Sequence, residues 1–351
     1  MLEIPTQFTR RSFSKSLLTC LAASMMPIKN ELNLESKVIK PPRLKAGDTI
    51  GVVSPAGITY DPILIDVLTE SLDVLGLKMK RGEHMQDRWG YFAGEDQDRA
   101  ADINQMFADP AVDAIFALHG GWGAARTLDH IDYNLIRNNP KVILGYSDIT
   151  ALLVAIYSRS GIATFHGPNG NSKWNTFSAE YVRRLLFDAD QISYANPVDE
   201  DDLLAPRRFR TRTIQSGKAT GKLVGGNLTV LTSIIGSDYL PDWKGHVLFL
   251  EDIGEAVYRV DRMLTQLKLA GVLDNLSGFV FGYCTDCKAD SGYSSFTLNE
   301  VLDQHIKPLG IPAWTGSMIG HIDKKFTLPL GIEAEINADT GEIKLLEAAV
   351  V

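Results

Sequence analysis

Short runs of consecutive apolar residues alternate, in the first half of the chain, with segments in which apolar residues recur every three or four positions. Three short runs have the length and β-branched content of buried strands, at 48–54, 114–118 and 142–144. Three segments have helical spacing, at 61–75, 97–108 and 149–158. Strands that alternate with helices are typical of a parallel sheet, so we predict an N-terminal parallel-sheet α/β domain over residues 40–168.

The first of these helices carries both end signals and a clear apolar pattern. Pro62 suits the first turn of a helix, and Gly76 suits the position just after its end. The residues expected to form its buried face share helical spacing: Leu64, Val67, Leu68, Leu72 and Leu75.

The pattern changes between residues 169 and 217, which are polar and lack sustained periodicity. We predict a linker there, with one helix near 179–187. Beyond it, helices are expected at 228–235 and 258–269, strands at 246–250 and 278–281, and a hairpin at 332–346. The sequence therefore predicts a second, smaller C-terminal α/β domain over residues 218–351.

Composition narrows the possible function classes. The chain has 351 residues, is 45% hydrophobic and carries a formal net charge of -8. The negative net charge argues against a nucleic-acid-binding protein, because phosphate binding needs a basic surface. No apolar run approaches 20 residues, so we predict no transmembrane segment. Three cysteines are too few for a disulfide framework.

The N-terminus has the pattern of an export signal. Arg10 and Arg11 precede Phe13 and a weakly apolar run at 17–24, an order typical of a twin-arginine signal. We therefore assign residues 1–30 to a signal and tether, and expect the protein in the periplasm, or in the cytoplasm if the signal is not used. A basic amphipathic helix is the alternative. Cys20 follows Leu-Leu-Thr, a poor match to a lipoprotein cleavage box.

A serine lies on a predicted strand-to-helix turn, Gly145-Tyr146-Ser147-Asp148. Such a turn exposes the hydroxyl, and the following helix N-terminus offers N–H groups to a developing oxyanion. The usual hydrolase motif has a second glycine where this chain has Ile149, so Ser147 or Asp148 could equally be a helix N-cap.

Two more strand ends carry suggestive residues. The loop His119-Gly120-Gly121-Trp122-Gly123 could present backbone N–H groups to a ligand, or be a plain tight turn. Glu251, Asp252 and Glu255 follow the strand at 246–250, where they could act in catalysis or pair with Arg259 and Arg262.

A nucleophilic serine needs a base, and the chain has seven histidines. His119, His166 and His321 lie in loops or at strand ends, and the residues alone do not rank them. Cys284 and Cys287 form one Cys-x-x-Cys pair without further ligands, which argues against structural zinc. A local disulfide or a redox pair is possible, and buried free thiols are the simpler expectation. We expect no metal and no cofactor.

Together these segments resemble the LD-carboxypeptidase family, serine peptidases that comprise the muramoyltetrapeptide carboxypeptidases and the microcin C self-immunity peptidases. The matching segments occur in the family's order, at 51–57, 120–123, 145–148, 165–168, 225–228, 250–252, 258–262, 320–321 and 327–331. They span about residues 45–346, and the ordered set is far more specific than any one segment.

The resemblance implies a Ser-Glu-His triad at Ser147, Glu251 and His321, in a crevice between the two domains. It places the oxyanion donors on the backbone of Gly121 and Asp148. It also implies a homodimer, and a reaction that releases the terminal D-alanine of a murein tetrapeptide. Many family members are cytoplasmic, so an export signal is a departure.

Substrate contacts are expected from Trp122 and His166, and the terminal carboxylate is assigned to Arg126, Arg259 or Arg262, which could instead form surface salt bridges. Two other functions stay open. One is a peptidase of the same fold that acts on a microcin-like peptidyl nucleotide. The other is a non-catalytic periplasmic binding protein, in which the three triad residues would have no need to converge.

Overall fold

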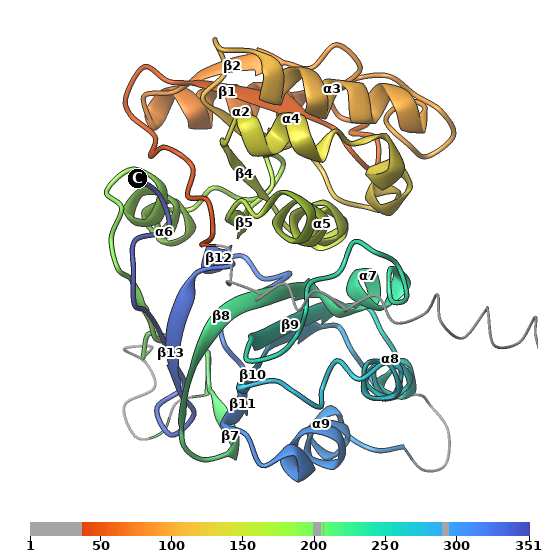
Figure 1. Ribbon diagram of the computed structural model, residues 1–351, viewed down its shortest axis with the longest axis vertical. Helices are drawn as coiled ribbons and strands as arrows, with labels where there is room; N and C mark the ends of the chain where they lie inside the picture. The colour runs from red at the N-terminus through yellow and green to blue at the C-terminus, as the bar shows by residue number, and fades with distance from the viewer. Residues whose placement is uncertain (1–36, 199–204, 206, 290–294) are drawn as a thin grey trace, which may run out of the picture. The chain divides into compact units, whose positions relative to one another are not determined.

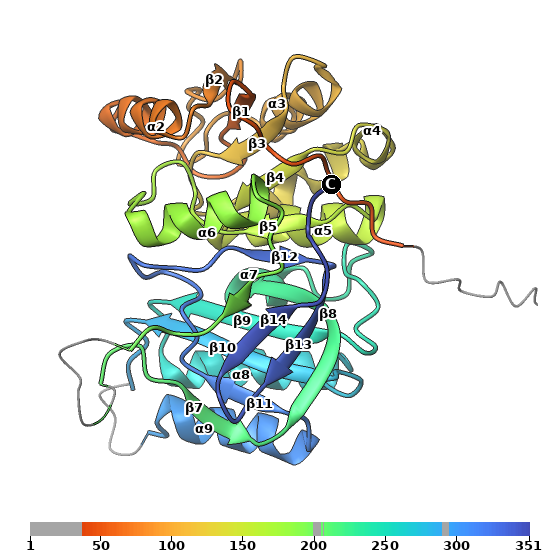
Figure 2. The same cartoon turned by 90° about the vertical axis from the view of Figure 1, so that its left-hand side faces the viewer.

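Two β-sheets organise the chain, as the computed structural model shows in two orthogonal views (Figures 1 and 2). The structure describes residues 37–198, 205, 207–289 and 295–351. The predicted export signal, with Arg10, Arg11 and Cys20, lies outside these residues. Val38–Val351 form one compact unit that contains both sheets.

The first sheet has six strands and is parallel except at one edge. In sheet order its strands are β12 (Leu328–Leu330), β5 (Thr164–His166), β4 (Val142–Gly145), β3 (Ala114–Ala117), β1 (Thr49–Val53) and β2 (Lys78–Arg81). Every residue of β3 and β4 is buried, as expected for strands covered on both faces. The three apolar runs predicted as strands are the three at the centre of this sheet.

The second sheet has eight strands and is mixed. In order these are β6 (Ser193–Tyr194), β14 (Glu342–Leu345), β13 (Glu333–Asn337), β8 (Lys218–Asn227), β9 (Val247–Ile253), β10 (Gly278–Thr285), β11 (Ala313–Thr315) and β7 (Arg212–Gln215). The centre, β8 to β11, is parallel, and the flanking strands are antiparallel. The predicted hairpin at 332–346 is the β13–β14 pair.

Helices connect the strands of both sheets. The α-helices are α2 (Ile63–Val74), α3 (Asp96–Ala108), α4 (Tyr133–Asn138), α5 (Thr150–Ser160), α6 (Thr176–Leu186), α7 (Leu228–Ser233), α8 (Val257–Leu269) and α9 (Leu298–Ile306). The 3₁₀ segments are η1 (Ala124–His130), η2 (Ser147–Ile149) and η3 (Lys307–Leu309). Figure 1 shows α5 and α6 on the side of the first sheet that faces the second, where α5 contacts β8 and α7. Because α5 is covered by protein on both sides, nearly all its residues are buried.

The fold class is the predicted one, an α/β chain with a parallel sheet and a second sheet. The predicted packing of the first helix is wrong in part. The buried residues of α2 are Ile65, Leu68 and Leu72, whereas Val67 is 45% exposed. Consecutive residues of an α-helix are separated by about 100° of rotation about its axis. The predicted face and the observed face therefore differ by less than a third of a turn.

The stretch predicted as a linker carries three elements. The helix α6 buries Val182, Leu185 and Leu186, and the strands β6 and β7 lie at the two edges of the second sheet. Late in the chain, β12 pairs with β5 and so returns to the first sheet. The chain thus passes from the first sheet to the second and back to the first. The domain limits at 168 and 218 remain predictions.

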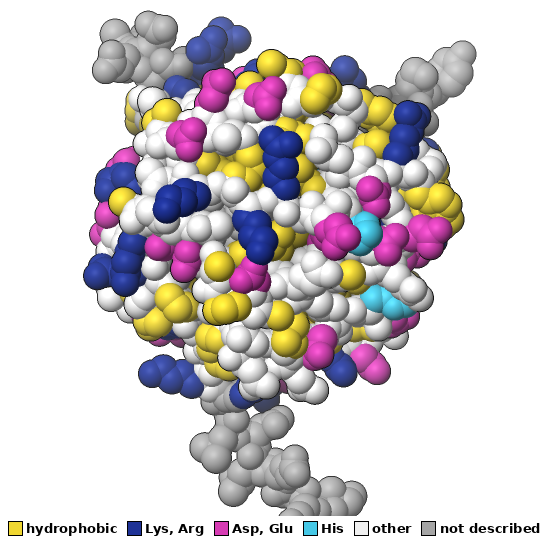
Figure 3. All heavy atoms as spheres, turned by 90° about the horizontal axis from the view of Figure 1, so that it is seen from above, with side chains coloured by type: hydrophobic (Ala, Val, Ile, Leu, Met, Phe, Trp, Pro, Cys, Tyr) yellow, Lys and Arg dark blue, Asp and Glu magenta, His cyan; other side chains and the backbone are white. Residues whose placement is uncertain are grey.

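The surface carries both signs of charge. On the face shown in Figure 3, basic and acidic side chains are interspersed among the described residues and form no large basic area. Among the same residues, no helix has the length and hydrophobicity that crossing a bilayer requires.

Candidate active site

Ser147 lies on a sharp turn between β4 and α5. Its φ angle is +64°, a left-handed conformation that is rare for a residue other than glycine. The side chain of Asn169 holds the preceding peptide, because its Oδ1 accepts a hydrogen bond of 2.9 Å from the N–H of Tyr146. Backbone strain of this kind is common where a nucleophile is held out from the sheet.

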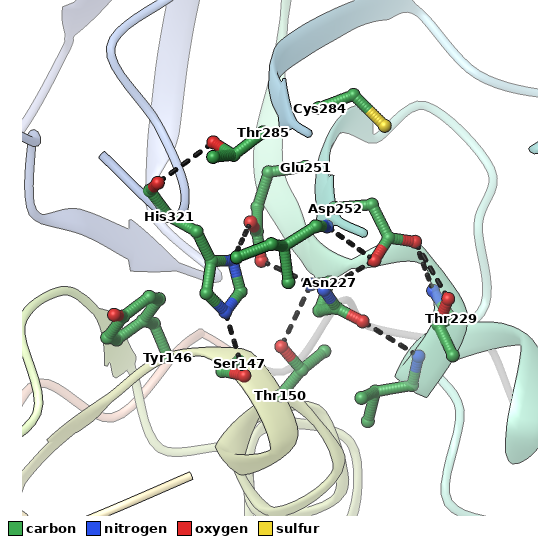
Figure 4. Close-up of polar contacts among 12 residues, drawn as sticks. Tyr146, Ser147, Thr150, Asn227, Thr229, Glu251, Asp252, Cys284, Thr285 and His321 are labelled. Atoms are coloured by element: carbon green, nitrogen blue, oxygen red, sulfur yellow. Dashed lines mark hydrogen bonds and ion pairs between the residues drawn. The ribbon is translucent and has the colours of Figure 1, made fainter. Parts of the chain in front are cut away.

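The side chains of Ser147, His321 and Glu251 form a continuous chain of hydrogen bonds (Figure 4). Nε2 of His321 lies 3.0 Å from Oγ of Ser147, and Nδ1 lies 2.7 Å from Oε2 of Glu251. The serine comes from the first sheet, the glutamate from β9 of the second, and the histidine from the loop before β12. The structure thus brings together three residues that are up to 174 positions apart.

Glu251 is fully buried and is held by contacts on both carboxylate oxygens. Burial alone would raise its pKa, but the hydrogen bond and charge of His321, with a further bond from Asn227, lower the pKa overall. The histidine loop approaches so closely that a Cβ on Gly320 would lie 2.5 Å from Oε2 of Glu251. Gly320 has a φ of +114°, so both space and backbone require glycine here.

Asn227 connects the glutamate to the elements around it. Its Oδ1 caps α7 by accepting from the N–H of Val230 at 3.0 Å. Its Nδ2 is thereby turned toward Glu251 at 3.2 Å and Asp252 at 3.1 Å. Asp252 also accepts two bonds from Thr229, and burial raises the pKa of Asp252 to about 6. The side chain of Asp252 therefore joins the end of β9 to the start of α7, while the side chain of Glu251 bonds to His321.

The glycine loop after β3 lies directly against Ser147. A Cβ on Gly120 would lie 3.2 Å from Oγ of Ser147. The next residue, Gly121, has a φ of +91°, and within the described residues its N–H donates to no acceptor. Arg99 anchors the loop from below, since the buried guanidinium donates to the carbonyls of Pro55 and Gly123. Within the described residues, the residue that follows Gly120 thus has an unused N–H donor.

Asp148 connects this loop to the serine turn. Its Oδ2 accepts a 2.7 Å bond from the N–H of Ala124. Burial raises the pKa of Asp148 to about 6, although that bond and the charge of Arg99 oppose the rise. The side chain of Asp148 thus holds the glycine loop and the serine turn together.

The remaining predicted residues lie in less direct positions. Trp122 is 52% exposed and packs against Tyr91 and Phe92 beside the glycine loop. His166 is fully buried, edge-on to Tyr146, and a substrate has no surface of it to contact. Burial lowers the pKa of His166 to about 4, and neither ring nitrogen has a hydrogen-bond partner within the described residues. The structure therefore argues against His166 both as base and as a substrate contact.

The arginines assigned to the substrate carboxylate already have partners. Arg126 donates to Asp96 at 2.8 and 2.9 Å and stacks over Trp89 and Phe92. Arg259 pairs with Glu255 at 3.6 Å on an exposed helix face. Arg262, its neighbour along α8, lies over the ring of Tyr258. The contacts of Arg126 and Arg259 match the alternative interpretation of surface salt bridges, whereas the contact of Arg262 is with an aromatic ring.

The expectation of free thiols at Cys284 and Cys287 is wrong, because the two residues form a disulfide at the end of β10. The bonded strand lies beside the site: Cys284 pairs with Asp252 in the sheet. Between the cysteines, Oγ1 of Thr285 donates to the carbonyl of His321 at 2.8 Å (Figure 4). The spacing of three residues allowed a local disulfide but did not distinguish it from a reduced pair.

One described group of side chains could hold a metal ion, His84 with Asp87 and Asp98. It contains none of the residues around Ser147. Nδ1 of His84 is already bonded to Asp87 at 2.7 Å. A nucleophile, a base, an orienting carboxylate and backbone donors can perform acyl transfer without a metal.

Sequence reasoning missed the supporting residues Asn169 and Arg99, and it noted Gly320 only as part of a matching segment. Asn169 and Arg99 are polar residues buried far along the chain from their partners, and nothing in their local pattern indicates this. Gly320 directly precedes His321, and a glycine beside a candidate base was the available signal.

Comparison with known proteins identifies relatives over almost the whole described chain. Family models described as the LD-carboxypeptidase N-terminal and C-terminal domains match residues 50–167 and 220–336. A probable murein peptide carboxypeptidase of Bacillus subtilis is 37% identical over 315 residues, which are 89% of this chain and 95% of the relative. The microcin C7 self-immunity protein MccF of Escherichia coli is 31% identical over 331 residues, 87% of this chain and 94% of that protein.

Solved structures agree with the sequence matches. MccF in the apo state superposes with a TM-score of 0.80 at 28% identity, covering 89% of this chain and all of that one. A muramoyltetrapeptide carboxypeptidase from Oxalobacter formigenes gives a TM-score of 0.73 at 28% identity, covering 85% of this chain and 97% of that one. With both family domains matched and relatives above 30% identity, the chain belongs to the LD-carboxypeptidase family of serine peptidases.

Proposed function

We propose that this protein is a serine LD-carboxypeptidase that releases the terminal D-alanine from murein tetrapeptides. The observation that carries the proposal is the hydrogen-bonded chain from Ser147 through His321 to Glu251. A non-catalytic binding protein has no need for this convergence. The family and the murein peptide carboxypeptidases among its relatives support the class of substrate.

In the proposed mechanism, Oγ of Ser147 attacks the scissile carbonyl while Nε2 of His321 takes the hydroxyl proton. Buried Glu251 holds the imidazole in place and stabilises the imidazolium that forms. The N–H groups of Gly121 and Asp148 bind the oxyanion, each contributing about 3–4 kcal/mol to stabilising the transition state. His321 then gives its proton to the amine of D-alanine, which leaves. Water attacks the acyl-enzyme with His321 again as base, which frees the tripeptide and Ser147.

The bond specificity can be tested with two peptides. Purified protein is incubated with a tetrapeptide that ends in a diamino acid and D-alanine, and separately with the D-Ala-D-Ala pentapeptide. We expect D-alanine, followed by mass spectrometry, from the tetrapeptide alone. Preferential cleavage of the pentapeptide or of an internal cross-link would contradict the proposal.

The second candidate is hydrolysis of a peptidyl nucleotide. The similarity to MccF favours it, and a solved MccF structure with a TM-score of 0.80 contains aspartyl sulfamoyl adenosine. The two candidates share the triad and differ in the group that leaves. An aminoacyl sulfamoyl nucleoside assayed beside the tetrapeptide separates them, since each candidate predicts that only its own compound is turned over efficiently.

The location proposed for the enzyme follows from the pattern of its N-terminus, and the proposed assembly follows from the family resemblance. Arg10 and Arg11 are proposed to direct export to the periplasm. Replacing both with lysine should leave the precursor in the cytoplasm, whereas unprocessed wild-type protein in the cytosol would contradict export. The proposed homodimer predicts twice the monomer mass in sedimentation experiments, and a monomer at working concentration would contradict it.

A further inference from the structure

A buried lysine lies against the ring of the residue that precedes Ser147, and its ammonium has no hydrogen-bond partner within the described residues. Lys325, in the loop between His321 and β12, is only 5% exposed. Its Nζ lies 3.8 Å from the centre of the Tyr146 ring. Within the described residues the only hydrogen bond from Lys325 is that of its backbone N–H to Oγ of Ser178 at 3.1 Å. The ammonium therefore has three unused N–H donors.

Burying an ammonium group without a hydrogen-bond partner costs free energy, so we expect a function that needs it. Burial lowers the pKa of Lys325 to about 8, while the charges of Glu251 and Asp323 oppose that change. Neither carboxylate neutralises it: Glu251 is bonded to His321 and Asn227, and Asp323 pairs with Lys173 at 3.0 Å. An ammonium that is desolvated and unpaired binds an incoming carboxylate strongly.

The position suits the end of a substrate. The ring of Tyr146 that contacts Lys325 also lies 4.9 Å from the ring of His321, centre to centre, and Tyr146 directly precedes Ser147. In a carboxypeptidase substrate the terminal carboxylate carbon lies only about 3–4 Å from the scissile carbonyl carbon. The cation that binds it must therefore lie close to the nucleophile and base, and the link from Lys325 to His321 is through the ring of Tyr146.

We propose that Lys325 binds the terminal carboxylate of the substrate and so makes the enzyme select peptides with a free C-terminus. This inference rests on the proposed carboxypeptidase function. It replaces Arg126, Arg259 and Arg262, whose charges are used in other contacts. The ligand class is a peptide α-carboxylate, held by charge-assisted hydrogen bonds.

The test compares two substrates in three proteins. The substrates are the tetrapeptide with a free carboxylate and the same peptide ending in D-alaninamide. The proteins are the wild type, Lys325→Met and the neighbouring exposed Lys324→Met as control. We expect Lys325→Met to lower kcat/KM for the acid by roughly 10- to 100-fold and to leave the slower amide reaction unchanged. Lys324→Met should retain the wild-type preference for the acid.

The amide reaction is the control for folding, because a misfolded variant would lose activity on both the acid and the amide. Equal losses on acid and amide, or an unchanged acid preference in Lys325→Met, would overturn the assignment.

A binding measurement distinguishes a failure of the proposed carboxylate site from a failure of the proposed reaction. Calorimetric titration of acid and amide into Ser147→Ala, with and without Lys325→Met, should show a preference for the acid that requires Lys325. If the wild type turns over neither peptide but this preference is present, the proposed reaction fails and the carboxylate site stands. If neither peptide binds, or both bind alike, the carboxylate site fails.

Discussion

At the scale of single residues, the site depends on backbone conformations that fix side chains with little freedom. Ser147 has a positive φ, and Gly121 and Gly320 have φ values of +91° and +114°. Each of the three lies where another element approaches within contact distance. The geometry of the proposed site therefore depends on close backbone packing as well as on the side chains of Ser147, Glu251 and His321.

Gly320→Ala tests this packing. The new Cβ would lie 2.5 Å from Oε2 of Glu251, so the histidine loop must shift. Displacing a catalytic group by about 1 Å costs on the order of 100-fold in rate, and we expect at least that loss in kcat/KM. Gly310→Ala is the control, because Gly310 also has a positive φ but no atom within 4 Å of the added Cβ. It should cost about 1 kcal/mol of stability and no activity. Full activity in Gly320→Ala would refute the packing argument.

His166 gives a prediction about stability and pH. Its pKa is about 4 in the folded protein and 6.5 in the unfolded chain, so the unfolded state takes up a proton first as the pH falls. The stability contributed by neutral His166 is complete above about pH 6.5 and is lost as the pH falls toward 4. Asp148 and Asp252, with raised pKa values, act in the opposite direction over a similar range. Asp148 and Asp252 contribute equally to the pH dependence of the wild type and of His166→Leu. Their contribution therefore cancels in the difference between the two free energies of unfolding.

The free energy of unfolding, from urea titrations at several pH values, should therefore change relative to His166→Leu by about 3 kcal/mol between neutral pH and pH 4. The wild type loses stability more steeply on acidification. A His130→Gln variant, altered at an exposed histidine, should track the wild type. A pH-independent difference between wild type and His166→Leu would show that His166 is not kept neutral by burial.

At the scale of elements, the end of β10 supports His321, the proposed base. The disulfide closes a loop of four residues, Cys284 to Cys287, and Thr285 within it donates to the carbonyl of His321. Closing so short a loop stabilises the fold by about 2 kcal/mol in the chain-entropy account. Replacing both cysteines by serine should cost about that much in urea unfolding and lower kcat several-fold. Dithiothreitol should destabilise the wild type and leave the double variant unchanged; a reductant-insensitive wild type would contradict this role.

The elements also show what a sequence reveals and what it does not. Strands β1, β3 and β4 were predictable because a strand buried on both faces is a continuous apolar run. The exposed Val67 on α2 was not, because spacing gives the period of a helix but only loosely its rotation. The position of β12 at the edge of the first sheet was not predictable either, since pairing between residues 328 and 166 leaves no local pattern.

At the scale of the whole molecule, the two halves of the chain share one site. Ser147 comes from the first sheet, Glu251 from the second and His321 from the segment that returns to the first. The family resemblance indicated these three residues, while the residues alone left His119, His166 and His321 unranked. Only the fold distinguishes them, since it buries His166 and bonds Nδ1 of His119 to Asn171. Lys325 was missed for the same reason, because an unpaired buried cation is a property of the packing.

The central claim is that Ser147 is the nucleophile of a hydrolytic triad that releases D-alanine. The most direct measurement is the rate of D-alanine release from a murein tetrapeptide by the wild type and by Ser147→Ala, with folding checked by circular dichroism. We expect steady release by the wild type and a loss on the order of a million-fold in the folded variant. Release by Ser147→Ala near the wild-type rate would contradict the account.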